Sequence, residues 1–367
     1  MNIPDLSCEL LPTHDGRLLA VATLDSERSL NALTLTMVDG LLAALADWAA
    51  DPRVVAVLLR GRGDRAFCAG GDVRRLTEAA RAGRQDASDA ATFFAREYRL
   101  DHAIHRYAKP VIVWGSGVVM GGGMGLFIGA SHRVVTDTSR LAMPEITIGL
   151  YPDVGGSHFL SRLPGRLGLF LGLTGVTFGA ADALHLGLAT QALPSGGWEA
   201  LVAGLQAANW AAEAHEQVTR VLAAQALSTL PAGPLQQQAD AIAALMSPPD
   251  LPTLDAAWRA STPEDAWLAK AVAGYRKGSP TSAALIWRQW ETSRTRGLAD
   301  VFRTEWVLSV QCVLHADFPE GVRALLVDKD LAPRWSPATL AEVDADHIEA
   351  HYALPAGMTH PLEDLVD

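Results

Sequence analysis

A buried strand followed by a glycine tract constrains the fold of this chain more than any other feature. Residues 110–114 (PVIVW) are apolar and rich in β-branched side chains, which predicts a strand buried in a parallel sheet. Three adjacent glycines at residues 121–123 come shortly after it. Glycine inside a helix costs about 1 kcal/mol relative to alanine, so the tract predicts a close approach of the backbone to another group. Its N–H groups would either bind an oxyanion at a helix start or lie in a tight strand–helix packing contact.

Two carboxylates follow the glycine tract. Glu145 ends the segment MPE, and Asp153 lies in the segment YPDVGG at residues 151–156. Both acids have apolar neighbours in a segment broken by proline and glycine, which predicts that they are partly withdrawn from water. Withdrawal from water raises the basicity of a carboxylate toward the range useful in catalysis. The alternative is structural, with Glu145 capping a helix and Asp153 beginning a turn.

A second glycine loop strengthens the prediction of an active site. Residues 54–59 (VVAVLL) predict another strand, and residues 67–72 (FCAGGD) predict a glycine-bearing entry into a helix. Two such loops from neighbouring strands could each offer one N–H group to the same carbonyl oxygen. Acyl-transfer sites stabilise a tetrahedral or enolate oxyanion in this way.

Four segments of the chain closely resemble the crotonase, or enoyl-CoA hydratase/isomerase, superfamily. They are residues 29–33 (SLNAL), 67–72 (FCAGGD), 120–125 (MGGGMG) and 143–145 (MPE). The resemblance spans roughly residues 10 to 195.

A longer run, MPEITIGLYPDVGG at residues 143–156, is similar to the 3-hydroxyisobutyryl-CoA hydrolase branch of this superfamily. Residues 93–98, 317–330 and 333–335 agree with that branch, so the likeness covers most of the chain.

The resemblance implies a role for each matching residue. The backbone N–H groups of Gly71 and Gly122 would bind the thioester carbonyl, and Glu145 and Asp153 would be the catalytic acids. Glu145 would act either as a nucleophile or as a general base toward water, and Asp153 would orient water or a substrate hydroxyl. The substrate-contacting positions are Glu97, Ala69 and Gly70.

One departure from the hydratase pattern separates the branches. Hydratases of the superfamily use a glutamate just after the glycine tract as well as one at the position of Glu145, whereas this chain has Gly125 at the first position. Loss of one acid/base group typically costs about 10²-fold or more in rate, so hydrolysis is favoured over hydration.

The resemblance implies an acyl-CoA thioester hydrolase of the 3-hydroxyisobutyryl-CoA hydrolase branch, which would act in valine catabolism and release CoA and 3-hydroxyisobutyrate. An enoyl-CoA hydratase or isomerase is the first alternative, and a non-catalytic acyl-CoA binding protein is the second. No cofactor is expected, because CoA is part of the substrate.

The predicted fold class is α/β, with a crotonase-like ββα spiral core and an added C-terminal helical region. The expected division is a catalytic core at residues 1–195, helices at 196–345 packed on the core or a partner subunit, and a tail at 346–367. Residues 355–367 offer few apolar side chains and are expected to be loosely ordered. Residues 79–91 are expected to form a mobile flap. Thr36 and Asp39 are expected to cap the helix that follows them.

The composition excludes several classes of partner and site. A net charge of −11 and the absence of a long apolar segment argue against nucleic-acid and membrane partners. Three scattered cysteines and an N-terminal segment without a basic, apolar leader predict a cytoplasmic protein. The pairs His102/His105 and His347/His351 lie in polar segments and are expected on solvated helix faces, so no metal is predicted. A homo-oligomer is possible by the same family resemblance.

Overall fold

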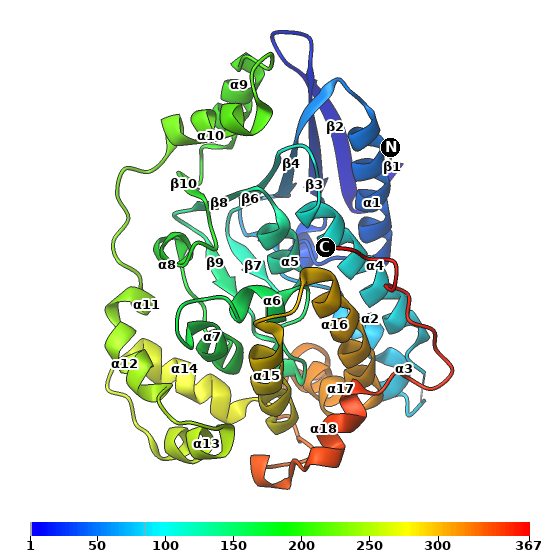
Figure 1. The fold of residues 1–367 in the computed structure, drawn as a ribbon, viewed down its shortest axis with the longest axis vertical. Helices are drawn as coiled ribbons and strands as arrows, with labels where there is room; N and C mark the ends of the chain where they lie inside the picture. The colour runs from blue at the N-terminus through cyan, green and yellow to red at the C-terminus, as the bar shows by residue number, and fades with distance from the viewer. Residues whose placement is uncertain (1, 85) are drawn as a thin grey trace. The chain divides into compact units, whose positions relative to one another are not determined.

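The computed structural model of the chain describes residues 2–84 and 86–367 (Figure 1). The chain forms two compact units, and neither is one continuous stretch of sequence. Unit 1 comprises Met1–Gly71, Leu100–Leu141 and Phe178–Gln236, and unit 2 comprises Asp72–Arg99, Ala142–Thr177 and Gln237–Asp367. Each unit therefore combines segments that are distant in the sequence.

Unit 1 contains a seven-stranded sheet in the order β1-β2-β3-β4-β6-β8-β10 (Figure 1). From β3 onward the neighbouring strands are parallel, whereas β1, β2 and β3 pair antiparallel. The strands are β1 (Asn2–Ile3), β2 (Leu6–Pro12), β3 (Leu18–Leu24), β4 (Val54–Gly61), β6 (Val111–Gly115), β8 (His132–Thr136) and β10 (Gln191–Leu193). Every residue of β6 is buried, so the strand predicted at residues 110–114 is confirmed within one residue at each end.

A second, three-stranded sheet has the order β5-β7-β9. Its strands are β5 (Ala66–Cys68), β7 (Val118–Met120) and β9 (Arg140–Ala142). β5 and β7 run parallel, and α5 (Gly122–Gly129) begins two residues after β7. The carboxyl ends of β5 and β7 therefore lie at one edge of this small sheet, which is where both glycine loops begin.

The apolar core of unit 1 includes helices from beyond the predicted core boundary at residue 195. Leu201 and Leu205 of α9 (Trp198–Ala207) and Val218 and Leu222 of α10 (Ala214–Gln225) have no exposed surface. They belong to the same hydrophobic cluster as strand residues of β3, β4, β6 and β8. The structure thus places residues 196–236 with the sheet, because their buried stripes complete its core. The remaining helices and turns of unit 1 are η1 (Glu27–Ser29), α1 (Leu35–Ala50), part of α4 (Ser88–His105), α8 (Ala180–His185) and most of α11 (Pro234–Gln237).

Unit 2 is helical, and its core also joins segments from both sides of the predicted boundary. Trp258 is fully buried, with its ring 6.1 Å from that of Phe170 and 5.0 Å from that of Tyr275. Its elements are α2 (Val73–Leu76), α3 (Glu78–Arg81), the first part of α4, η2 (Glu145–Ile148), α6 (Gly156–Leu160), α7 (Leu167–Thr174), α12 (Ala239–Leu245), α13 (Leu251–Ala260), α14 (Ala266–Lys277), α15 (Pro280–Ser293), α16 (Leu298–Leu314), α17 (Asp317–Val322), η3 (Arg323–Val327), η4 (Leu340–Glu342) and α18 (Ala345–Tyr352).

The C-terminal residues are anchored more firmly than the sequence predicted. Leu362 and Leu365 are buried, at 0% and 6% exposure. Asp364 forms an ion pair with Arg99, and Asp367 accepts a hydrogen bond from the N–H of Ala299. The segment after residue 355 was expected to be loosely ordered because it has few apolar side chains, but two leucines and two aspartates are enough to attach it to unit 2.

The predicted flap at residues 79–91 overlaps two helices. α3 ends at Arg81 and α4 begins at Ser88. Gln85 lies outside the described residues. The mobility of the segment stays a prediction, which hydrogen exchange in the free protein tests through the protection of its amides.

The N-cap of helix α1 (Leu35–Ala50) lies two residues before the predicted capping residue Thr36. Thr34 is its N-cap, and the Thr34 side chain accepts a hydrogen bond of 3.3 Å from the N–H of Met37. Thr36 is an exposed residue inside the helix. The predicted cap at Thr36 and Asp39 is therefore wrong, because the extended backbone that an N-cap needs occurs at Thr34.

We expect Thr34→Ala to lower the free energy of unfolding by about 1 kcal/mol, because one N–H group at the helix start loses its acceptor. Thr36→Ala is the matched control and should change stability by less than about 0.5 kcal/mol. Chemical denaturation of both variants measures the difference. Equal losses would contradict the assignment of Thr34 as the cap.

Candidate active site

The two glycine loops lie next to each other in unit 1. The segment containing Ala69, Gly70 and Gly71 follows β5, and Gly122 begins α5 after β7. A Cβ atom placed on Gly70 would be 3.5 Å from the carbonyl oxygen of Met120 and 3.6 Å from the nitrogen of Gly122. The structure thus brings together the two loops that the sequence predicted as neighbours.

Backbone hydrogen bonds and glycine conformations hold these loops in place. The N–H of Leu33 donates to the carbonyl of Gly70 at 2.8 Å, and the N–H of Ala69 donates to the carbonyl of Leu30 at 3.0 Å. Gly70 has a φ of 111° and Gly121 a φ of 50°, backbone conformations that residues other than glycine rarely adopt. Glycine is therefore required at both turns.

The N–H groups of Gly71 and Gly122 form no hydrogen bond with any other residue in the described part of the chain. Gly122 is buried and is the first residue of α5, a position whose N–H has no intrahelical acceptor. Two such groups from adjacent loops are suited to hold the oxygen of a polarised carbonyl.

Three carboxyl groups are buried within unit 2. Glu145 begins η2, Asp153 lies in the turn between η2 and α6, and Glu97 lies on α4. Their exposed fractions are 4%, 4% and 2%. One carboxyl oxygen of Glu97 (Oε1) and one of Glu145 (Oε2) are buried without a hydrogen-bond partner among the described residues. Unsatisfied buried oxygens of this kind are expected where a ligand or water binds.

Burial raises the pKa values of all three acids, and charge repulsion adds to this effect for Glu145 and Glu97. Burial raises the pKa of Glu145 well above its usual range, and the nearby charges of Asp153 and Glu97 add to this effect. Burial also raises the pKa of Glu97, and Asp153 adds to it. Burial raises the pKa of Asp153 to about 6, while a hydrogen bond from Tyr98 acts in the opposite direction. Asp153 is thus the acid whose ionised form is best stabilised, and its pKa suits proton exchange near neutral pH.

Sequence reasoning missed the residues that hold Asp153 in place. The hydroxyl of Tyr98 donates to Oδ2 of Asp153 at 2.6 Å. Glu305 of α16 accepts hydrogen bonds from the N–H groups of Gly155 at 2.7 Å and Ser157 at 3.0 Å, just after Asp153 in the chain. Tyr98 adjoins the predicted Glu97, but no local pattern identifies Glu305.

We expect Glu305 to make the protein less stable as the pH rises. Burial raises the pKa of Glu305 from its ordinary value of 4.5 to about 8. Between these values the folded state binds a proton that the unfolded state lacks, so the free energy of unfolding falls with increasing pH. Glu305→Gln should flatten this fall between about pH 5 and pH 8. Chemical denaturation across this range tests it with the exposed Glu264→Gln as control, and an unchanged slope in Glu305→Gln would contradict it.

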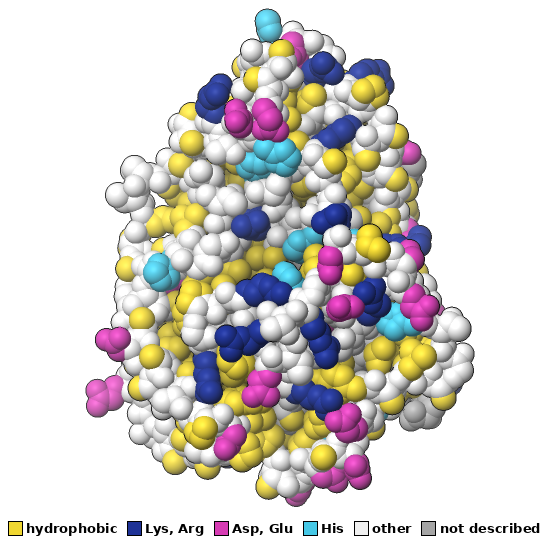
Figure 2. Space-filling model, viewed as in Figure 1, with side chains coloured by type: hydrophobic (Ala, Val, Ile, Leu, Met, Phe, Trp, Pro, Cys, Tyr) yellow, Lys and Arg dark blue, Asp and Glu magenta, His cyan; other side chains and the backbone are white. Residues whose placement is uncertain are grey.

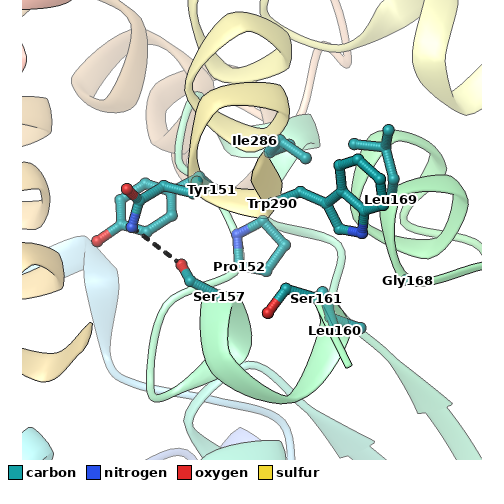
Figure 3. Close-up of a pocket in the computed structure, with 10 residues that line it drawn as sticks. Tyr151, Pro152, Ser157, Leu160, Ser161, Gly168, Leu169, Ile286 and Trp290 are labelled. Atoms are coloured by element: carbon teal, nitrogen blue, oxygen red, sulfur yellow. Dashed lines mark hydrogen bonds between the residues drawn. The ribbon is translucent and has the colours of Figure 1, made fainter. Parts of the chain in front are cut away.

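A small cavity adjoins the turn that carries Asp153 (Figure 3). Tyr151, Pro152, Ser157 and Trp290 are among its lining residues, and the side-chain amide of Gln289 donates to the hydroxyl of Ser157 at 3.1 Å. Its volume is about 10 Å³, close to the minimum that holds one water molecule. This cavity is too small for an acyl group.

Figure 2 shows Lys and Arg side chains gathered around the place where Figure 1 labels α6, α15 and α16. Two arginines between α6 and α7 in the sequence bind the protein itself. Arg162 donates to the carbonyls of His158 and Arg296, and Arg166 donates to the carbonyls of Met246 and Pro248. We therefore do not assign these two arginines to the phosphates of CoA.

The histidine pairs differ from the solvated faces that the sequence predicted. His351 is 1% exposed, and its ring stacks on that of His315 with 3.9 Å between centroids. His102 is also buried, at 8% exposure. Within residues 2–84 and 86–367, no group of three or more His, Cys, Asp or Glu side chains is arranged to hold a metal ion, and no helix is long and apolar enough to cross a membrane.

The strands, the glycine loops and the helical additions together define a crotonase-type α/β fold, the class that the sequence predicted. The chain belongs to the enoyl-CoA hydratase/isomerase family, whose model matches residues 19–352.

Relatives and solved structures extend along nearly the whole chain. The chain is similar to a mitochondrial 3-hydroxyisobutyryl-CoA hydrolase of Danio rerio, at 39% identity over 90% of this chain and 85% of the relative. The corresponding protein of Homo sapiens is 34% identical over the same shares. A crystal structure of a carnitinyl-CoA dehydratase from Mycobacterium thermoresistibile has a TM-score of 0.85 and 35% identity, covering 99% of this chain and 100% of the other.

These relatives correct the predicted location. Both named hydrolases are mitochondrial proteins, so the cytoplasmic location expected from the N-terminal composition is wrong. The composition of a short N-terminal segment is a poor guide to the cellular compartment, because it can only be compared with the known types of leader sequence.

Proposed function

We propose that this protein is an acyl-CoA thioester hydrolase that acts on 3-hydroxyisobutyryl-CoA and releases CoA and 3-hydroxyisobutyrate, a reaction of valine catabolism. The observation that carries the proposal is the buried pair of acids Glu145 and Asp153 in a chain that has Gly125 where a hydratase needs its other glutamate. The hydrolase names of the relatives support it.

In this proposal, the N–H groups of Gly71 and Gly122 bind the thioester carbonyl oxygen and stabilise the negative charge that develops on it. Ala69, Gly70 and Glu97 contact the substrate. The unpaired state of the two N–H groups and the adjacency of their loops support these roles.

Glu145 supplies the carboxylate that attacks the carbonyl carbon or removes a proton from the attacking water. Asp153 orients that water or the 3-hydroxyl group. The C–S bond then breaks, and the sulfur leaves as a thiolate whose conjugate thiol has a pKa of about 8.5, so no strong acid is needed at the leaving group. Water provides the hydroxyl of the new acid and, overall, the proton of the thiol.

Hydration or dehydration of an acyl-CoA is the second candidate, because the solved structure with a TM-score of 0.85 is titled a dehydratase. A non-catalytic acyl-CoA binding protein is the third. The buried acids disfavour a binding protein, since keeping several carboxyl groups out of water lowers stability and binding alone does not require them.

Thiol release from a panel of acyl-CoA thioesters, with and without a 3-hydroxyl group, tests the proposal. We expect the fastest release from 3-hydroxyisobutyryl-CoA. Crotonyl-CoA separates the candidates, because hydration removes its conjugated absorbance without releasing free thiol. Conversion of crotonyl-CoA without thiol release from any thioester would overturn the hydrolase assignment. A homo-oligomer stays a prediction, which sedimentation of the protein tests.

A further inference from the structure

A chain of buried hydroxyl groups leads away from Asp153 inside unit 2. Oδ2 of Asp153 lies 2.6 Å from the hydroxyl of Tyr98, which lies 2.6 Å from Oγ of Ser309. Oγ of Ser309 lies 2.9 Å from the hydroxyl of Tyr151, which lies 2.8 Å from the backbone carbonyl of Glu305. Tyr98, Ser309 and Tyr151 are each 0% exposed, so their hydroxyls can pair only with one another and with the two ends of the chain.

The number of protons in this chain depends on the protonation state of Asp153. Three hydroxyls carry three protons, but the chain has four oxygen–oxygen contacts. When Asp153 is ionised, Tyr98 donates to it and Ser309 donates to Tyr98, while Tyr151 donates to the Glu305 carbonyl. The contact between Ser309 and Tyr151, the longest of the four at 2.9 Å, then holds no proton.

A proton on Oδ2 of Asp153 reverses the order. Asp153 then donates to Tyr98, Tyr98 to Ser309, Ser309 to Tyr151, and Tyr151 to the Glu305 carbonyl, so all four contacts hold a proton. Each hydroxyl keeps one proton throughout, and only the directions of the Tyr98 and Ser309 hydroxyls change. The three hydroxyls can therefore satisfy both states of Asp153 without movement of any heavy atom.

The titratable groups around Asp153 do not compensate its negative charge, so its hydrogen bonds matter for the ionised form. The titratable groups that interact with it are all acids: Glu97 and Tyr98 from α4, Glu145 from η2, Tyr151 from its own turn, and Glu305 and Cys312 from α16. None of them can carry a positive charge. Hydrogen bonds from the Tyr98 hydroxyl and from the backbone then stabilise the carboxylate, and the bond from Tyr98 contributes more.

We propose that Tyr98 is a positioning residue that fixes Oδ2 of Asp153, and that the hydroxyls of Tyr98 and Ser309 reverse their direction as Asp153 gains and loses a proton during turnover, with Tyr151 as the acceptor at the far end. The catalytic part of this inference rests on the proposed function, whereas the reversal is a property of the unliganded protein. Asp153 can thus exchange protons with water or a substrate hydroxyl while its orientation stays constant.

Two substitutions are expected to shift the titration of Asp153 in opposite directions. Tyr98→Phe removes the donor to the carboxylate, so the midpoint should rise by about one pH unit. Ser309→Ala leaves Tyr98 with Asp153 as its sole acceptor. The Tyr98 hydroxyl then has no acceptor when Asp153 is protonated, so the protonated form is disfavoured and the midpoint of the Asp153 titration should fall. Tyr151→Phe is the control. It should change the midpoint least, since the Ser309 hydroxyl can then donate to a carbonyl of its own helix.

The test is an infrared difference titration of the Asp153 carboxyl in the full chain, with Asp153→Asn as the blank. The acid limb of the kcat profile, measured with a thioester that the enzyme hydrolyses, should move in the same sense for each variant. A simple donor role for Tyr98 predicts that Ser309→Ala moves the midpoint upward or not at all, and either result would overturn the reversal.

The two proposals fail separately. The infrared titration needs no substrate, so absence of thiol release with any thioester would refute the hydrolase assignment and leave the titration readable. If Tyr98→Phe does not fold, Ser309→Ala decides alone, because the sign of its shift distinguishes the two cases.

Discussion

Glu145→Gln is expected to lower kcat for thioester hydrolysis by about 10²-fold or more. An amide is neither a nucleophile nor a base toward water at neutral pH, so it removes both roles proposed for this side chain. KM should change little if Glu145 acts mainly in the transition state.

Folding should survive this substitution. Burial and the charges of Asp153 and Glu97 raise the pKa of Glu145, so the folded protein disfavours the ionised form of this side chain. Glutamine replaces it with a neutral group of the same shape, and the melting temperature should be unchanged or higher. The loss of activity would then reflect chemistry rather than unfolding.

The exposed Glu264→Gln in the same unit is the matched control and should retain full activity. The measurement is steady-state thiol release under saturating substrate, together with thermal unfolding of both variants. Activity of Glu145→Gln within about threefold of the unaltered protein would remove Glu145 from the mechanism.

Gly123→Ala is expected to lower both stability and activity. A Cβ atom at this position would lie 2.3 Å from the carbonyl oxygen and 2.9 Å from the Cβ atom of Cys68. Either α5 or the loop after β5 must move, and overpacking of this kind typically costs about 1–3 kcal/mol. Gly71 comes three residues after Cys68, so its N–H group would be displaced from that of Gly122.

A displacement of about 1 Å at a catalytic group can cost about 10²-fold in rate, so kcat should fall by a similar factor. The control is Gly196→Ala, because a Cβ atom there would have no neighbour within 4 Å. Chemical denaturation and thiol release measure the two effects. If Gly123→Ala matched Gly196→Ala in both, the close contact between Cys68 and α5 would not be needed for the site.

The local features of the site were predictable from the sequence. The strand at residues 110–114, the glycine loops and the turn containing Asp153 each depend on residues that are close in the chain. A run of β-branched residues indicates a buried strand, and glycine is favoured where φ is positive, as at Gly70 and Gly121. The roles of Gly71, Gly122, Glu145 and Asp153 stay predictions that the proposed variants test.

The division into units was harder to predict. The sequence suggested a linear boundary after residue 195, but α9 and α10 complete the core of unit 1, and residues 142–177 share a core with Trp258 and Tyr275 in unit 2. An amphipathic pattern predicts that one face of a helix is buried, but it does not predict which other element of the protein that face packs against.

The sequence by itself determined the family, the parallel strands and the positions of the glycine loops, because these depend on short-range residue preferences and on motifs. Only the tertiary structure decided which groups surround Asp153. Tyr98 and Ser309 are separated by 211 positions, and Gly155 and Glu305 by 150. Such pairs form because packing around a common core brings together segments that are far apart in the chain. No local sequence pattern indicates which distant hydroxyl or carboxyl group will lie beside Asp153.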